Sequence, residues 1–168
     1  AKTAQIDIKI PNAHLWSLED PFLYNYQIQV GEGVQSDEVK GYFGMRKISV
    51  MNLPGSTIPY IALNNKPIYL QLALDQSYHP DGFYTFPSDA FMKDEIIRSK
   101  RIGLNGIRTH IKVDIPRKLY WADKLGLLVM SDVPNSWGEP DADMRRETEY
   151  TLHEMLKRDF NHPSIFSW

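Results

Sequence analysis

The stretch Arg158-Asp159-Phe160-Asn161-His162-Pro163-Ser164-Ile165-Phe166-Ser167-Trp168 joins two kinds of secondary structure. Pro163 ends the helix that carries Arg158 and Asp159, because proline has no N–H to donate and biases the preceding residue towards extended geometry. Residues 165–168 are mostly β-branched or aromatic, as in a buried strand. The stretch predicts a helix that is followed by a strand, although by itself it also fits a loop before an edge strand.

The residues before this stretch predict an alternation of strands and helices. Apolar runs of strand length alternate with segments of helical spacing, and Ser88, Pro116 and Gly126 stand where helix caps are expected. The expected order is strand 68–74, helix 88–103, strand 106–109, helix 116–126, strand 127–130, helix 144–155 and a strand from residue 165. This order is that of half an α/β barrel or of one side of a doubly wound sheet.

The first part of the chain has the two-residue period of half-buried strands. Residues 3–10 alternate, residues 24–30 alternate again until Gly31-Glu32-Gly33, and residues 37–50 form a third run. Gly44 inside the third run predicts a bulge or a point of close approach. We expect these three antiparallel strands to form part of a β-sandwich, followed by a hairpin that turns at Asn64-Asn65.

Composition restricts the function classes. A chain of 168 residues with a net charge of −2 has no reason to bind nucleic acid or an anionic membrane surface. With no cysteine, disulfides and thiolate metal sites are excluded, and no apolar run approaches the length of a membrane helix. We expect no cofactor, and the aromatic content of 12% suits either a saccharide binder or a β-rich core.

In parallel α/β architecture, ligands meet the chain just after the carboxyl ends of the strands. Polar and aromatic side chains follow the first three predicted strands of the second part, which suits a hydroxyl-rich ligand. They are Asp75, Gln76, Tyr78, His79, Asp81 and Tyr84; Arg108, His110 and Lys112; and Asp132, Asn135, Trp137 and Glu139. The first of these loops, residues 75–82, has no glycine-rich phosphate cradle, which disfavours a nucleotide-binding protein.

Each candidate also has a structural interpretation. Arg108 fits a ligand-binding cation and equally an ion-pair partner of Asp132 or Asp75. His110 fits a sugar contact or an acid–base group, but a lone histidine is more often a structural residue. Asp75 and Asp132 fit a general acid and nucleophile, yet carboxylates at strand ends commonly orient an arginine.

Two further alternatives concern aromatic and metal-binding groups. Trp137 fits a platform on which a sugar ring stacks and equally an anchor of its own loop. His79, His110 and His162 lie in different loops without a short-spaced ligand pair, so we expect no metal site.

Six short motifs follow one another along the chain from about Leu15 onwards. They are Trp16–Tyr24, Phe43–Arg46, Leu63–Leu70, Arg108–His110, Gly126–Val129 and Arg158–Ile165. In this order they resemble the segments W-x-x-x-x-P-x-L-Y, F-G-x-R, L-N-G-K-P-x-x-L, R-T-S-H, G-L-L-V and R-D-x-N-H-P-S-I of glycoside hydrolase family 2, the β-galactosidase and β-glucuronidase family.

The resemblance implies an α+β fragment of a longer enzyme. Residues 1–55 would be the last strands of an immunoglobulin-like β-sandwich domain, and residues 56–168 the first half of a (β/α)8 TIM barrel. It also implies a retaining glycosidase, which uses one glutamate as acid/base and another as nucleophile. Both glutamates are expected beyond Trp168, so we predict that the chain is inactive alone.

Within this chain the resemblance implies a substrate-binding role for Arg108 and, with a spacing one residue shorter than in the family, for His110. Their position after the predicted strands adds Asp75, Asp132 and Trp137 as substrate-binding candidates. The departures from the family are Leu72 in place of glycine, Asp75-Gln76 in place of a common histidine, and Asp132 in place of glutamate. We therefore expect a divergent branch that acts on carbohydrate. The alternative is a non-catalytic carbohydrate-binding or interaction module, and a half barrel with open edges predicts self-association.

Overall fold

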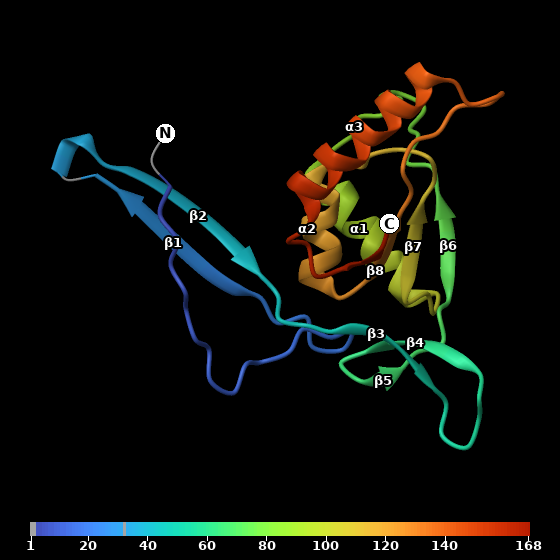
Figure 1. Ribbon diagram of the computed structural model, residues 1–168, viewed down its shortest axis with the longest axis horizontal. Helices are drawn as coiled ribbons and strands as arrows, with labels where there is room; N and C mark the ends of the chain where they lie inside the picture. Colours follow the sequence, from blue (N-terminus) through green and yellow to red (C-terminus); the bar gives the residue numbers. More distant parts are fainter. Residues whose placement is uncertain (1–2, 32) are drawn as a thin grey trace.

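A computed structural model describes residues 3–31 and 33–168 (Figure 1). Its second part is a parallel sheet with strand order β6-β7-β8-β9. The strands are β6 (Leu72–Asp75), β7 (Gly106–Thr109), β8 (Leu128–Ser131) and β9 (Ile165–Ser167). Because consecutive strands are neighbours and parallel crossovers are right-handed, the three connecting helices lie on one face of the sheet. The predicted alternation of strands and helices is confirmed.

The helices begin and end where local chemistry predicts. Helix α1 (Asp89–Arg101) has Ser88 as N-cap, whose hydroxyl accepts a hydrogen bond from the Phe91 N–H at 3.1 Å. Helix α2 (Pro116–Leu125) starts with proline at its first position and ends at Gly126, which adopts a left-handed φ of 72°. Helix α3 (Ala142–Asp159) extends the segment predicted at 144–155 at both ends.

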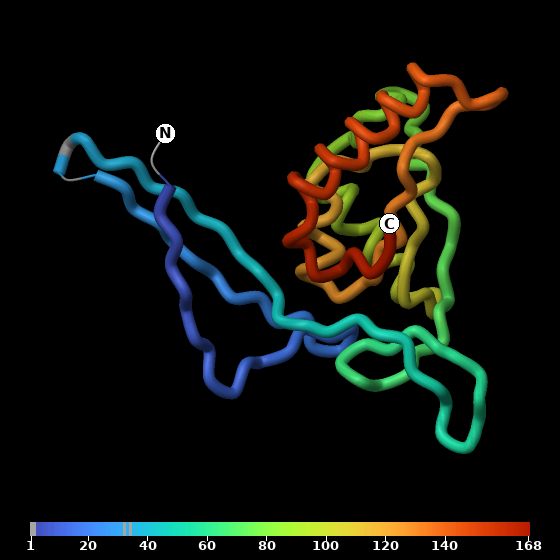
Figure 2. The backbone as a smooth tube through the Cα atoms, viewed as in Figure 1, coloured from blue at the N-terminus to red at the C-terminus, as the bar shows by residue number. Residues whose placement is uncertain are grey.

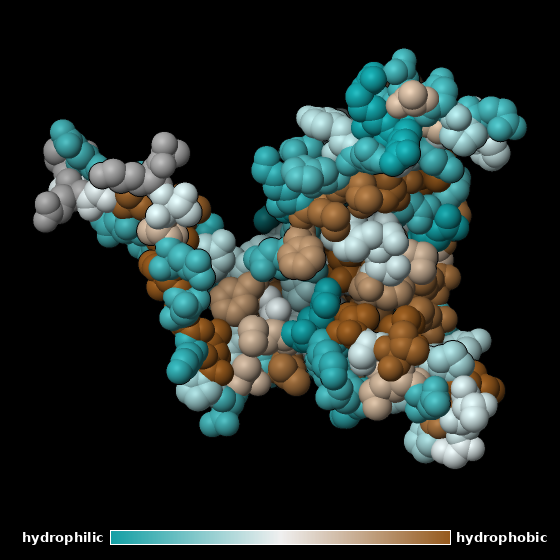
Figure 3. Space-filling view, in the orientation of Figure 1, coloured by the Kyte–Doolittle hydropathy of each residue, from teal (hydrophilic) through white to brown (hydrophobic). Residues whose placement is uncertain are grey.

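The first part of the chain contains two antiparallel sheets. β1 (Tyr24–Val30) pairs only with β2 (Asp37–Phe43) among the described residues, and the short 3-10 helix η1 (Gly33–Gln35) lies between them. β3 (Ile48–Asn52), β4 (Pro59–Leu63) and β5 (Lys66–Pro67) form the other sheet. Figure 2 and Figure 3 show the β1–β2 ribbon extending away from the parallel sheet.

Two predictions for this part are wrong in detail. Residues 3–10 form no strand, and Ile6 and Ile8 are 78% and 77% exposed, because no strand in the described residues pairs with them. The run predicted at 37–50 is two strands that belong to different sheets, with the break after Phe43. Glu32, which was expected to help close the first ribbon, lies outside the described residues. In the parallel part, the strand predicted at 68–74 is shorter than expected, because β6 covers only Leu72–Asp75.

Gly44, at the break between β2 and β3, is a point of close approach, as predicted. A Cβ atom there would lie 2.7 Å from the Cβ and Cγ atoms of Pro163 and 3.3 Å from Cβ of Trp16. The predicted hairpin is also confirmed, with Asn64 and Asn65 at φ values of 51° and 63° between β4 and β5.

Two apolar clusters hold the fold together. One lies between the helices and the parallel sheet and includes Ile96, Ile107, Leu119 and Val129. The other joins Trp16 and Leu63 of the first part to Leu128 of β8, and the Trp16 indole N–H donates to the Asp123 carbonyl at 2.7 Å. The antiparallel and parallel parts therefore share a core. None of the helices in the described residues has the length and apolar character that a membrane span requires.

Candidate functional site

The carboxyl ends of the parallel strands bring the predicted polar residues to one edge of the sheet. Asp75, Thr109 and Ser131 are in register at the ends of β6, β7 and β8. The ladder continues one residue further, because the His110 N–H donates to the Asp75 carbonyl at 2.9 Å and the Asp132 N–H to that of Thr109 at 3.2 Å. Four of the five predicted substrate-binding residues, Asp75, Arg108, His110 and Asp132, thus belong to this edge.

Arg108 and Asp132 form a two-pronged ion pair across this edge. The Arg108 Nε and Nη2 groups donate to Asp132 Oδ1 at 3.0 Å and Oδ2 at 2.8 Å. Burial raises the pKa of Asp132, but hydrogen bonds from Arg108 and from the Ile111 N–H outweigh it and hold this pKa below its usual value. Asp132 therefore stays ionised. Asp75 and Asp132 were both considered as ion-pair partners of Arg108, and Asp132 is the one that Arg108 contacts.

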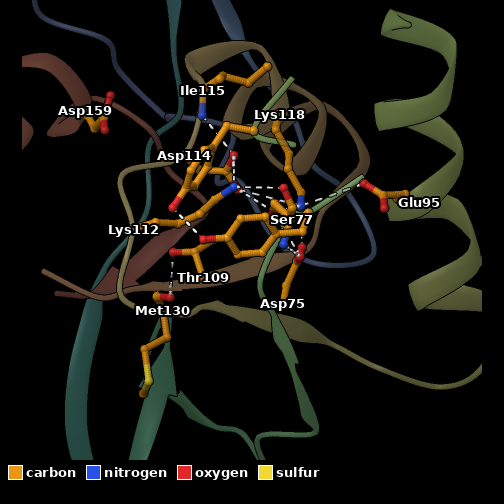
Figure 4. A network of polar contacts seen from close by, with 12 residues as sticks. Asp75, Ser77, Glu95, Thr109, Lys112, Asp114, Ile115, Lys118, Met130 and Asp159 are labelled. Atoms are coloured by element: carbon orange, nitrogen blue, oxygen red, sulfur yellow. Dashed lines mark hydrogen bonds and ion pairs between the residues drawn. The ribbon is translucent and has the colours of Figure 1, made fainter. Parts of the chain in front are cut away.

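Asp75 faces a buried lysine instead (Figure 4). Lys118 of α2 is 1% exposed, and its ammonium group donates to Asp75 Oδ2 and, at 2.8 Å, to the Ser77 hydroxyl. Asp75 Oδ1 accepts from the Ser77 N–H at 2.7 Å and from its hydroxyl at 2.9 Å. Burial raises the pKa of Asp75, but Lys118 and Ser77 together bring it below its usual value. Asp75 is thus an ionised residue that fixes the loop after β6.

Three further charged residues complete this buried network. Asp114 is 4% exposed and lies 3.6 Å from the Lys118 ammonium, while Lys112 is 8% exposed and donates to the Ser77 carbonyl at 3.2 Å. Glu95 of α1 lies 3.8 Å from Lys118, and its pKa is raised chiefly by burial. A cleft of about 490 Å³, lined in part by Asp75, Glu95 and Lys118, opens beside β6 and α1.

The His110 side chain is half-buried. Its ring makes one long hydrogen bond, in which Nδ1 lies 3.3 Å from the Gln76 amide nitrogen, so the ring is weakly held. The next residue, Ile111, has a left-handed φ of 48°. Its N–H donates to Asp132 Oδ2 at 3.2 Å, the oxygen that also accepts from Arg108. The position of His110 therefore depends on a backbone turn that Asp132 supports.

The aromatic candidates are largely exposed. Tyr78 and Tyr84 are 55% and 54% exposed, and their hydroxyl oxygens lie 2.5 Å apart. Trp137 is 96% exposed, so it packs against almost nothing and the interpretation as a loop anchor is wrong. The structure therefore leaves Trp137 as a free aromatic surface in the loop between β8 and α3.

The histidines considered as metal ligands lie in separate environments. The His79 ring packs between Phe86 and Phe91, whereas His162 lies 2.5 Å from the Asp123 carboxylate. Within residues 3–31 and 33–168, no three His, Asp or Glu side chains are grouped so that they could hold a metal ion.

The candidate list drawn from the sequence lacks Lys118, Ser77 and Asp114. A signal for them exists: Asp114 and Lys118 are four residues apart, the spacing of an ion pair across one helical turn. Lys118 also precedes the inward-facing Leu119 and lies four residues before Ala122, both of which are buried. A lysine on the apolar face of a helix indicates a buried partner.

Comparison with known proteins connects this architecture to one family. The family model described as "Glycosyl hydrolases family 2" matches residues 1–46. The β-galactosidase of Thermoanaerobacterium thermosulfurigenes is 32% identical over 155 residues, which are 92% of this chain and 21% of that protein. The β-glucuronidase of Streptococcus agalactiae is 25% identical, over 95% of this chain and 28% of that protein.

A solved structure agrees over both parts of the chain. The crystal structure of Parabacteroides merdae β-glucuronidase superposes with a TM-score of 0.82 and 24% identity, covering 94% of this chain and 19% of that one. The chain thus spans between 19% and 28% of the length of these relatives. The match to the family model and to the curated relatives shows that the chain belongs to glycosyl hydrolases family 2, and the solved structure shares its fold.

Proposed function

We propose that this chain is a segment of a retaining glycoside hydrolase that cleaves O-glycosidic bonds of a carbohydrate. Its relatives include β-galactosidases and β-glucuronidases, and they match over more than nine-tenths of this chain. The single observation that carries the proposal is the edge of the parallel sheet, where Arg108, His110 and Asp132 converge. An ionised, hydrogen-bonding edge of this kind suits the hydroxyl groups of a sugar.

The two parts of the chain have different roles in this proposal. Residues 1–55 form the last strands of an immunoglobulin-like sandwich domain, and residues 56–168 form the first half of a (β/α)8 barrel. Four parallel strands in sequential order, with helices on one face, support the half barrel. The boundary at residue 55 falls in the turn between β3 and β4, which pair with each other, so the two domains meet within one small sheet.

The proposed substrate-binding residues are Arg108, His110, Asp75, Asp132 and Trp137. Arg108 and His110 offer donors at the edge, Asp132 and Asp75 fix these donors and the adjoining loop, and Trp137 offers a ring for stacking. A general acid at neutral pH needs a raised pKa, whereas the pKa values of Asp75 and Asp132 are lowered. An ionised carboxylate could act as a nucleophile, but ion pairs with Lys118 and Arg108 hold these two carboxylates in place. We therefore assign both the acid/base and the nucleophile to other segments of the longer protein.

The chain alone is accordingly expected to leave nitrophenyl glycosides intact. The test compares the 168-residue chain with a protein of the relatives' length that contains it, using nitrophenyl β-galactoside and β-glucuronide. The longer protein should release nitrophenol, and Arg108→Ala should lower its kcat/KM. Turnover by the 168-residue chain that Arg108→Ala abolishes would contradict this division of the active site.

A non-catalytic carbohydrate-binding module is the second candidate, and the exposed rings of Tyr78, Tyr84 and Trp137 favour it. Such a module binds glycans through these rings without any acid–base pair. A glycan array with the 168-residue chain separates the two functions. Strong binding that Trp137→Ala abolishes supports the module, whereas the segment of a hydrolase is expected to bind weakly.

A further inference from the structure

Ile111 is the most unusual backbone position at the candidate site. It is a β-branched residue with a φ of 48°, a region in which the Cβ atom crowds the backbone. Glycine would adopt this conformation without strain. Such outliers persist only where the surroundings hold them, and they gather at functional sites.

The contacts that hold Ile111 come from both sides of the turn. Its own N–H donates to Asp132 Oδ2 at 3.2 Å. On the amino-terminal side, the His110 N–H is fixed to the Asp75 carbonyl. On the carboxyl-terminal side, the Lys112 side chain is buried and donates to the Ser77 carbonyl. The turn at residues 110–112 is therefore constrained at three consecutive residues.

Asp132 connects this turn to Arg108. Its Oδ2 atom accepts from both the Arg108 Nη2 group and the Ile111 N–H, while Oδ1 accepts from the Arg108 Nε group. A single carboxylate thus fixes the guanidinium of one candidate and the backbone that carries the other, His110. An amide at this position has only one acceptor oxygen and cannot replace all three bonds.

We propose that Asp132 and the left-handed Ile111 act together as positioning residues, which present Arg108 and His110 to the substrate in one fixed arrangement. The inference rests on the proposed function, because it assigns these groups to the sugar-binding edge. Neither Asp132 nor Ile111 needs to touch the substrate. Their effect is to remove alternative positions of Arg108 and His110 before a sugar binds.

The first experiment tests positioning without any enzyme assay. In the 168-residue chain, the imidazole signals of His110 are followed by ¹H–¹³C NMR in wild type, Ile111→Gly, Ile111→Ala and Ile111→Asn. Glycine relaxes the strain and frees the turn, so Ile111→Gly should broaden or shift the His110 signal while keeping the melting temperature at or above that of Ile111→Ala. Asparagine tolerates the left-handed conformation and should keep the wild-type signal.

The second experiment measures catalysis by the longer protein. Ile111→Gly and Asp132→Asn should lower kcat/KM by about tenfold or more, as expected for misplaced binding groups. Asp132→Glu, which keeps both oxygens, should recover more activity than Asp132→Asn. Asn12→Gly is the matched control, since Asn12 also has a positive φ of 53° but lies in an exposed turn, and it should leave the kinetics unchanged.

The outcomes separate the inference from the proposed function. A His110 signal and a kcat/KM that Ile111→Gly leaves at the wild-type values would overturn the positioning role, even if the longer protein is an active glycosidase. If the longer protein cleaves no glycoside, the proposed function fails and the His110 spectra alone decide the positioning role. If Ile111→Gly does not fold, the same spectra of Asp132→Asn and Asp132→Glu decide it.

Discussion

Replacing Lys118 by methionine should be among the most damaging single changes in the parallel part of the chain. Methionine keeps most of the volume of the side chain but removes the ammonium group. Asp75 and Asp114, which are 21% and 2% exposed at their side chains, would then lose the cation that lies between them. A buried carboxylate without its partner is strongly destabilising.

The expected loss follows from the contacts that remain. Removing one partner of a buried ion pair typically costs about 3–5 kcal/mol. Asp75 would keep two hydrogen bonds from Ser77, and Asp114 would keep the Ile115 N–H at 2.9 Å and Lys112 at 3.9 Å. We therefore expect the lower end, about 3 kcal/mol at pH 7, which is a large part of a typical unfolding free energy of roughly 5–15 kcal/mol.

The stability loss of Lys118→Met should depend on pH in a defined direction. In the wild type the pKa of Asp75 is lowered by folding, so its stabilisation is present above the pKa of the unfolded chain, about 3.9, and is lost as the pH falls through the folded value. Without Lys118, the charge and the hydrogen bond that lower this pKa are lost, so the pKa of Asp75 rises above its wild-type value, and the penalty of its buried charge is relieved when the carboxyl takes up a proton. The difference between variant and wild type should therefore shrink from pH 7 to pH 3.

Urea denaturation followed by circular dichroism, at one low protein concentration, measures the unfolding free energies of Lys118→Met and of the wild type. Lys124→Met is the matched control, because Lys124 lies on the same helix but is exposed, and it should change stability by about 0.5 kcal/mol or less. A loss below about 1 kcal/mol for Lys118→Met, or a loss of equal size at pH 7 and pH 3, would refute the assignment of Lys118 as the partner of buried carboxylates.

Three further predictions follow from other parts of the structure. Gly44→Ala should lower the unfolding free energy by about 1–3 kcal/mol, because its Cβ would overlap Pro163, whereas Gly41→Ala meets only the mobile end of Tyr26 and should cost less in thermal denaturation. Trp137→Ala should leave the melting temperature unchanged, since the side chain is 96% exposed, and a clear drop would show that the ring is packed. The open edges of β6 and β9 should cause concentration-dependent association in sedimentation velocity, and a strictly monomeric chain that unfolds cooperatively would contradict this.

Local chemistry accounts for the parts of the fold that the sequence predicts well. The N-cap at Ser88, the proline at position 116 and the left-handed Gly126 each act within one helical turn, so their effects can be predicted without knowing the tertiary structure. The Asn64-Asn65 turn is local in the same sense. The edge residues were also predictable, because parallel strands present their carboxyl ends together whatever their side chains are.

Other features depend on partners far away in the sequence. Residues 3–10 alternate like a strand, yet a strand exists only where another pairs with it, and none of the described strands does. Asp75 pairs with Lys118, whereas Asp132 pairs with Arg108. This choice of partners depends on how α2 packs against the sheet, which the alternation of strands and helices in the sequence does not specify. The strain at Ile111 is equally non-local, because Asp132 supports it across 21 residues of sequence.

Residues 158–168 also depend on contacts with distant parts of the sequence. The Arg46 guanidinium donates to the carbonyl oxygens of Pro163 at 3.0 Å and Ile165 at 2.5 Å. The Ser164 N–H in turn donates to Asp123 Oδ1 of α2 at 2.9 Å. Side chains from elsewhere therefore satisfy the backbone where β9 begins, and they set the position of this strand.

Tyr42 and Asp123 extend the same contact. The Tyr42 hydroxyl donates to Asp123 Oδ2 at 2.8 Å, and burial together with the Asp123 charge raises the pKa of this phenol, which keeps its proton in place. The Asn161 amide donates to the Tyr42 carbonyl at 2.8 Å. The motifs Phe43–Arg46 and Arg158–Ile165 look independent along the sequence but contact each other at one interface, in which Gly44 leaves room for Pro163. The antiparallel part of the chain is thus the support that positions β9, the fourth strand of the parallel sheet.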